Sequence, residues 1–175
     1  MSRIDPMPNR ASARTRDKVI DTVRALLSEG AFHESTVEKV AERAGVSRAT
    51  LYTHFGSRTG LVDSICERLN ATPALQEIRK TTDVARLIEL SVEFWAGDER
   101  IFEQLYGAAA VDPAAGDFVE RQRRDRTKEI RRIATSKEQQ AQLLLLTSFE
   151  TYRELRRGVG LPQAEVTATL QRLLR

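Results

Sequence analysis

The 175-residue chain is long enough for one large domain or two small ones, and its 41% hydrophobic and 30% charged residues are typical of a globular rather than a disordered protein. No stretch approaches the ~18 consecutive apolar residues of a membrane-spanning helix, and residues 1–10 are polar where a signal peptide has its apolar core, so we expect a cytoplasmic protein. The single cysteine, Cys66, excludes an internal disulfide and a metal site built from cysteines. The net charge of +3 does not by itself indicate nucleic-acid binding.

The spacing of apolar residues predicts helices nearly throughout and no sheet, so the expected fold class is all-α. Residues 1–11 are expected to form a disordered arm. In chain order, we expect helices over about residues 12–29, 36–44, 48–55, 58–70, 83–95, 99–111, 114–134, 136–157 and 162–174. Ser35 and Glu38 indicate a capping box at the start of the second helix, and Gly45 ends that helix.

Two short predicted helices, 36–44 and 48–55, are joined by a turn of about three residues that contains Gly45. This is a helix-turn-helix arrangement, in which the second helix enters the major groove of DNA. At 100° per residue, Leu51 and Phe55 point to the same side of the second helix. We therefore expect these two side chains to be buried.

The opposite side of the second helix carries Ala49, Thr50 and Thr53, and we expect it to face the groove. Small side chains allow a close approach, and their methyl groups can contact the methyl group of thymine. Arg48, at the start of the helix, has the reach and the donor geometry to bind guanine O6 and N7.

Tyr52 and His54 lie on the two flanks of the same helix, where a groove-bound helix meets the phosphate walls. The alternative interpretation is that both are ordinary surface residues of an amphipathic helix. The surrounding pattern favours contact with DNA.

Residues 35–61, STVEKVAERAGVSRATLYTHFGSRTGL, resemble the DNA-binding motif of TetR-family transcriptional repressors, and the resemblance covers about residues 12–70. It implies an N-terminal three-helix helix-turn-helix domain over 12–56, a linking helix over 57–70, and a C-terminal helical domain over 71–175 for effector binding and dimerisation. It also implies a homodimer on a palindromic operator in double-stranded DNA. The DNA-binding residues that it implies are Thr36, Ser47, Arg48, Ala49, Thr50, Tyr52, Thr53, His54 and Arg58.

Arg58 stands where the family usually has a lysine that binds phosphate, and arginine keeps that charge. By the same resemblance we expect a repressor that releases its operator when a small molecule of unknown identity occupies the C-terminal part. The alternative is a helix-turn-helix protein that a protein partner controls or that acts without a ligand. A closed cavity between residues 83 and 157 would favour control by a small molecule.

Residues 71–175 match no further motif. In this family the last two helices usually form the dimer interface, and pairing each with its symmetry mate gives a four-helix bundle. The interface residues that we expect are Leu144, Leu145, Ser148, Phe149, Tyr152, Leu161, Val166, Leu170 and Leu173.

Aromatic residues gather around the Gly97–Asp98 break and on the predicted helix over 136–157. Effector cavities have mostly apolar and aromatic walls with few polar groups. The residues expected to line such a cavity are Phe94, Trp95, Phe102, Tyr106, Phe149 and Tyr152. The alternative is that these are ordinary core and interface residues.

The basic run over 121–132 is interpreted as a solvated helix face, with an anionic effector or a protein partner as alternatives. Cys66 has the spacing of a core thiol, and two isolated histidines do not indicate a metal site. The sequence has no glycine-rich phosphate loop and no Ser/His/Asp arrangement. We therefore expect no enzyme activity, no cofactor and no metal.

Overall fold

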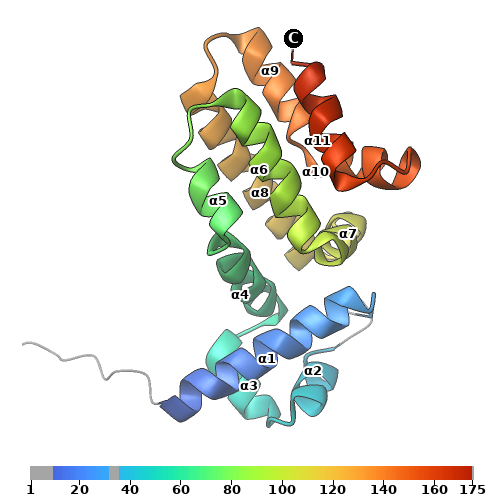
Figure 1. Ribbon diagram of the computed structural model, residues 1–175. Helices are drawn as coiled ribbons and strands as arrows, with labels where there is room; N and C mark the ends of the chain where they lie inside the picture. The colour runs from blue at the N-terminus through green and yellow to red at the C-terminus, as the bar shows by residue number, and fades with distance from the viewer. Residues whose placement is uncertain (1–9, 32–35, 175) are drawn as a thin grey trace, which may run out of the picture.

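The computed structural model describes residues 10–31 and 36–174, and in this part of the chain every regular element is helical (Figure 1). The all-α prediction is therefore confirmed. No helix in these two ranges combines the length and the hydropathy needed to cross a membrane. The elements are α1 (Arg10–Ser28), α2 (Val37–Ala44), α3 (Arg48–Phe55), α4 (Arg58–Asn70), α5 (Pro73–Ile78), α6 (Val84–Gly97), α7 (Glu99–Ala108), α8 (Pro113–Ile133), α9 (Lys137–Leu146), α10 (Phe149–Arg153), the π-helical turn η1 (Glu154–Gly158) and α11 (Gln163–Arg172).

Helices α1–α3 lie at one end of the molecule, and α6–α11 form a second group at the other end, with α4 and α5 between them (Figure 1). Helix α4 packs on α1 and α3 and also on α8. Helix α1 packs on α7 as well. The first three helices are thus connected to the rest of the molecule through the α4–α8 and α1–α7 contacts.

Aromatic rings from α6, α7 and α10 form the centre of the C-terminal bundle. The ring centroids of Trp95 and Phe102 lie 4.8 Å apart, and those of Trp95 and Phe149 lie 5.4 Å apart. All three side chains are buried. Such pairs add about 0.5–1.5 kcal/mol each to the free energy gained by burial alone. This cluster therefore fixes α6 and α7 against the C-terminal helices.

The prediction of one continuous helix over 136–157 is wrong, because the chain breaks between α9 and α10. Ser148 Oγ accepts a hydrogen bond from the Thr151 amide at 3.1 Å and caps α10. In a continuous helix that amide would donate to the Thr147 carbonyl. The Thr147 carbonyl instead accepts from Trp95 Nε1 at 3.0 Å. A contact with α6 thus accompanies the break.

Two further differences concern short local features. Helix α5, with Pro73 at its first position, lies in a segment for which no helix was expected. The N-cap of α2 is Thr36, whose Oγ1 accepts from the Lys39 amide at 3.3 Å, one residue after the serine of the expected capping box. Ser35 itself lies outside the described residues.

The boundary between the expected N-terminal arm and the first helix is also shifted. Helix α1 begins at Arg10, so it includes the last two residues of the arm expected over 1–11. Residues 1–9 lie outside the described part of the chain.

Candidate nucleic-acid interface and internal cavity

A left-handed glycine and a serine cap form the turn between α2 and α3. Gly45 has φ 62° and ψ 41°, a conformation that strains residues with a Cβ. The Val46 amide donates to the Ala41 carbonyl at 3.0 Å and closes the end of α2. Ser47 Oγ accepts from the Thr50 amide at 3.0 Å and starts α3. Because local bonds close both ends, the turn itself defines how the two helices meet.

Helix α3 has a buried side and an exposed side. Leu51 and Phe55 are buried, which confirms the prediction from helical spacing. Ala49 and Thr53 are exposed, and Thr50 is half-buried. Thr53 Oγ1 donates to the Ala49 carbonyl at 2.9 Å, so the Thr53 methyl group is the part of this side chain left for outside contacts. The exposed side of α3 is therefore small and rich in methyl groups, which suits close approach to a groove.

Arg48 extends from the first residue of α3 and is held by two neighbours. Its Nη2 lies 2.9 Å from Glu38 Oε1, and its guanidinium carbon lies 5.4 Å from the centroid of the exposed Tyr52 ring. The backbone amide of Glu38, the Thr36 hydroxyl and Arg48 lower the pKa of Glu38. Since both partners of this ion pair are exposed, exchanging Glu38 for another hydrogen-bond acceptor costs little free energy.

Three further residues expected to contact DNA lie in or next to α2 and α3: Thr36, Ser47 and His54. Glu38, in the first turn of α2, pairs with Arg48, so the start of α2 lies beside the start of α3. Thr36 and Ser47 are exposed helix caps, and His54 is half-buried.

A tight connection places α4 directly after α3. Gly56, with φ 68°, ends α3, and Ser57 Oγ accepts from the Gly60 amide at 3.2 Å to cap α4. A Cβ at Gly60 would lie 1.8 Å from the carbonyl oxygen of Phe55. No real Cβ contact is that short, so only glycine lets α4 approach α3 this closely.

Arg58, the predicted phosphate contact on α4, is bound to a carboxylate of the C-terminal bundle. Its Nε and Nη2 donate to Asp112 Oδ2 at 3.0 and 2.9 Å. Asp112 is the N-cap of α8, and its other oxygen accepts from the Ala114 amide at 3.0 Å. The sequence alone did not reveal this partner, because the two residues are 54 positions apart. The Asp112–Pro113 pair signals a helix start, but not what it contacts.

Two further ion pairs connect the N-terminal helices to the rest of the molecule. Arg24 of α1 pairs with Asp98 at the start of α7, and Arg121 of α8 pairs with Asp63 of α4. Such partly exposed pairs contribute up to about 1 kcal/mol each. Burial raises the pKa of Cys66, next to Arg121, to about 11. An unreactive thiol of this kind fits the interpretation of Cys66 as a core residue.

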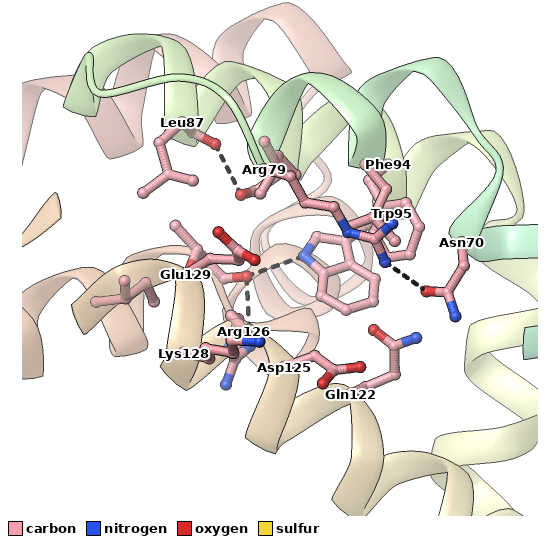
Figure 2. Close-up of a pocket in the computed structure, with 15 residues that line it drawn as sticks. Asn70, Arg79, Leu87, Phe94, Trp95, Gln122, Asp125, Arg126, Lys128 and Glu129 are labelled. Carbon is pink, nitrogen blue, oxygen red and sulfur yellow. Dashed lines mark hydrogen bonds between the residues drawn. The ribbon is translucent and has the colours of Figure 1, made fainter. Parts of the chain in front are cut away.

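A cavity of about 290 Å³ lies between the end of α4, α5, α6 and α8 (Figure 2). This volume is at the lower end of the ~300–1,000 Å³ range of small-molecule sites. Its apolar wall is made by Leu75, Ile78, Leu87, Phe94, Trp95 and Ile130. Its polar lining is made by Asn70, Arg79, Ser91, Gln122, Asp125, Arg126, Lys128, Glu129 and Thr147.

The six aromatic residues expected in one effector cavity are divided between three places. Phe94 and Trp95 line the cavity of Figure 2. Tyr106 and Phe149 line a second hollow, of about 570 Å³. The remaining two belong to the core and line neither of these hollows: Phe102 and Tyr152.

The basic run over 121–132 is not a single solvated face. Arg124 and Arg131 are exposed, as expected. Arg126 instead lines the cavity, and its Nη1 donates to the Thr147 carbonyl at 3.3 Å (Figure 2). Thr147 thereby accepts from both Arg126 and Trp95.

Arg126 is one of the lining residues that sequence reasoning missed. The signal was present in its spacing, because Arg126 lies eight residues after Phe118 and four before Ile130, both fully buried. Positions four apart share one face of a helix, so Arg126 falls on the apolar stripe of α8. A charged residue on such a stripe is a candidate for a function inside the bundle.

The residues expected at a dimer interface differ in how accessible the protomer leaves them. Leu145 and Leu173 are 65% and 58% exposed. Leu144 and Leu161 are half-buried. The other members are buried inside the protomer: Ser148, Phe149, Tyr152, Val166 and Leu170.

Residues 19–65 match a family model described as bacterial regulatory proteins of the tetR family. The chain is 32% identical over 108 residues to the HTH-type transcriptional regulator AlkX of Mycobacterium tuberculosis. The aligned region covers 62% of this chain and 48% of AlkX. It is 31% identical over 67 residues to the nucleoid occlusion factor SlmA of Actinobacillus pleuropneumoniae. The aligned region covers 38% of this chain and 33% of SlmA. The chain thus spans less than half the length of these curated relatives.

The fold as a whole is shared with a solved structure. A protein from Syntrophomonas wolfei, described as a TetR-family transcriptional regulator, superposes with a TM-score of 0.70 at 12% identity and 93% coverage of both chains. The family model includes the turn at Gly45 and all of α3. The segment over residues 19–65, which contains the helix-turn-helix, therefore belongs to the tetR family of bacterial regulatory proteins.

Proposed function

We propose that the chain is a transcriptional repressor that binds a palindromic operator as a homodimer and releases it when a small molecule occupies the cavity of Figure 2. The observation that carries DNA binding is the two-sided character of α3. Leu51 and Phe55 fix this helix on its domain, while Ala49 and Thr53 stay exposed. A helix held in this way can enter a major groove without loss of the core.

Within the groove, Arg48 binds guanine O6 and N7 after exchanging Glu38 for the base. This exchange requires only the loss of an exposed ion pair. Ala49, Thr50 and Thr53 lie against the base edges, where their methyl groups contact thymine methyls. The phosphate walls are contacted by Thr36, Ser47, Tyr52, His54 and Arg58.

Dimerisation supplies the second recognition helix. Half-sites lie ~34–36 Å apart, one turn of the duplex, so two copies of α3 must be held at that separation. Leu145 and Leu173 are the most exposed members of the expected interface. Leu144 and Leu161 are half-buried and come next in exposure. In this proposal, the buried members shape α10 and α11 from inside the protomer.

Release follows from the position of the cavity beside α4. Asn70, which lines the cavity, is the last residue of α4, and Arg58 is its first. A ligand that displaces Asn70 therefore acts on the helix that adjoins α3. It releases DNA only if it binds more tightly to a conformation whose two recognition helices no longer match the half-site spacing.

A second candidate is a helix-turn-helix protein that a protein partner controls or that acts without a ligand. The relative that favours it is SlmA, whose name describes nucleoid occlusion rather than the control of a gene. This candidate shares the DNA contacts of α3 and differs only in what changes the DNA affinity. It predicts that no small molecule shifts binding to the operator.

The test is selection of duplexes from a random DNA library by the purified protein at physiological salt, followed by sequencing. The proposal predicts one enriched palindrome and two chains bound per duplex. Arg48→Ala should relax the preference at one base in each half-site, while the matched change Arg124→Ala on the exposed face of α8 should not. Diffuse recovery, with affinity that falls steeply as salt rises, would overturn specific binding.

A further inference from the structure

The guanidinium of Arg126 lacks a counter-ion inside the bundle. Its Nη1 donates to the neutral Thr147 carbonyl at 3.3 Å, and its Nε is buried with no hydrogen-bond partner in the described part of the chain. None of the ion pairs formed among residues 10–31 and 36–174 includes Arg126. Burial lowers the pKa of this guanidinium, and the charges of Tyr106 and Glu150, which act in the opposite direction, do not outweigh it. A half-buried charge without an ion-pair partner is destabilising, so Arg126 lowers the stability of the folded protein.

The other charged groups that line the cavity do not compensate Arg126. Glu129 is engaged by Arg132, whose Nε lies 3.2 Å from Glu129 Oε2. Asp125 is exposed, as is Lys128, and these two opposite charges offset each other. Arg79 adds a further cation and donates to the Asn70 side chain at 3.4 Å. The lining therefore has an excess of positive charge.

The apolar wall of the cavity contains the indole of Trp95, which lies beside Arg126. Trp95 is held in place by its Nε1 bond to the Thr147 carbonyl, the same oxygen that accepts from Arg126 (Figure 2). The edge of the indole and the guanidinium of Arg126 thus meet at one carbonyl group. With a volume of about 290 Å³, the cavity has room for a small ligand only.

We propose that the cavity binds a small aromatic or compact apolar carboxylate, whose anionic group pairs with Arg126 and whose apolar part lies against Trp95. This deepens the proposed function by naming the chemical class of the effector, and its consequence for DNA rests on that function. A planar carboxylate fits the donor geometry of arginine and supplies the missing counter-ion. A cationic ligand, which would have to use Glu129, is disfavoured because Glu129 already has Arg132.

The binding test needs no DNA, because Trp95 is the only tryptophan of the chain and reports on its own cavity. Three probes of similar size are titrated while its fluorescence is recorded: phenylacetate, the neutral phenylacetamide and the cationic benzylamine. A hydrogen-bonded ion pair in a partly dry site should make phenylacetate bind about 10- to 100-fold more tightly than the amide. Benzylamine should bind more weakly than either.

Variants on α8 separate the charge of Arg126 from general effects. Arg126→Met should fold, because it removes a half-buried charge that has no ion-pair partner. It should reduce the preference for phenylacetate over the amide to less than about twofold. Arg126→Lys should retain part of the preference. Arg124→Met, an exposed change on the same helix, should keep all of it. Circular dichroism confirms that each variant is folded.

Three results would overturn the proposal: a preference for the anion that survives Arg126→Met, a preference for benzylamine, or no response of Trp95 to any probe up to millimolar concentration. A separate measurement of operator affinity with and without phenylacetate tests the consequence. If phenylacetate binds as expected but the operator stays bound, ligand-controlled release is wrong and the carboxylate site stands. If a neutral or cationic compound releases the operator, release stands and the carboxylate site is wrong.

Discussion

Arg58 and Asp112 form an ion pair between the first residue of α4 and the N-cap of α8, with side chains only 25% and 13% exposed. The guanidinium that we propose for a DNA phosphate is thus held by a carboxylate of the C-terminal bundle. Asp112 is itself fixed by capping α8. Phosphate and Asp112 therefore compete for Arg58, and any shift of α8 relative to α4 changes how readily Arg58 is released.

Removal of this competitor is expected to strengthen DNA binding. Asparagine caps helices as well as aspartate, so Asp112→Asn should remove the charge while the start of α8 is kept. Loss of a partly exposed pair worth about 1 kcal/mol should tighten DNA binding about fivefold. Fluorescence anisotropy with a labelled duplex measures the effect.

The control is Asp117→Asn, which makes the same change of charge at an exposed position of α8. It should alter DNA affinity only through net charge. An equal gain in both variants would show that Asp112 does not compete for Arg58.

Arg58→Ala and Arg48→Ala are expected to weaken DNA binding in different ways. Loss of a phosphate contact at Arg58 should lower affinity for every sequence alike and flatten the slope of log K against log salt by about one. Loss of Arg48 should cost about 1–3 kcal/mol on the operator and relax the preference at one base position. Salt titrations on the operator and on single-base variants distinguish the two. If both variants bound all duplexes like the wild type, the proposed docking of α3 would be wrong.

Gly60→Ala is expected to destabilise the N-terminal domain. The added Cβ would meet the backbone oxygen of Phe55 at 1.8 Å, and a backbone atom cannot rotate away as a side chain can. Overpacking of this kind should lower the free energy of unfolding by about 2 kcal/mol. Urea denaturation, followed by circular dichroism, provides the measurement.

Gly107→Ala is the matched control, because a Cβ at Gly107 in α7 meets no atom of the described residues within 4 Å. Alanine is the better helix former, so this variant should be as stable as the wild type or up to about 1 kcal/mol more stable. Equal losses for the two glycines would contradict the close approach of α3 and α4.

The reactivity of Cys66 should depend on whether the protein is folded. Burial raises the pKa of Cys66 to about 11, so at pH 8 the thiolate fraction in the folded protein is roughly a hundredth of that in the unfolded chain. Because the folded pKa is the higher one, the contribution of Cys66 to stability is full below about pH 9 and is lost as the pH rises through about 11. Alkylation by iodoacetamide with and without urea tests this, and similar rates in both would contradict it.

The helices of the helix-turn-helix were predictable because local signals set their ends. Ser47 and Gly45 act through bonds to residues three to four positions away, so α3 has the predicted bounds. The break between α9 and α10 was not predictable, because it accompanies the bond between Thr147 and Trp95, 52 positions apart. The same holds for Arg58 and Asp112, whose partnership depends on how α4 and α8 pack.

Part of the candidate site was within reach of the sequence, and part depended on the tertiary structure. The exposed side of α3 follows from helical spacing alone, as does the inward position of Arg126 on α8. Helical spacing cannot show that Arg126 lacks a counter-ion, because that depends on which carboxylates the neighbouring helices bring near. It also cannot separate aromatic residues that line a cavity, such as Trp95, from those that fill the core, such as Phe102.

The measurement that tests the central claim most directly is the affinity of the purified protein for its selected palindrome and for a scrambled duplex of equal length at physiological salt. The account predicts binding to the palindrome at least about 1,000-fold tighter, with two chains per duplex. It also predicts that Arg48→Ala reduces this ratio while Arg124→Ala leaves it unchanged. Equal affinity for the two duplexes would contradict sequence reading by α3.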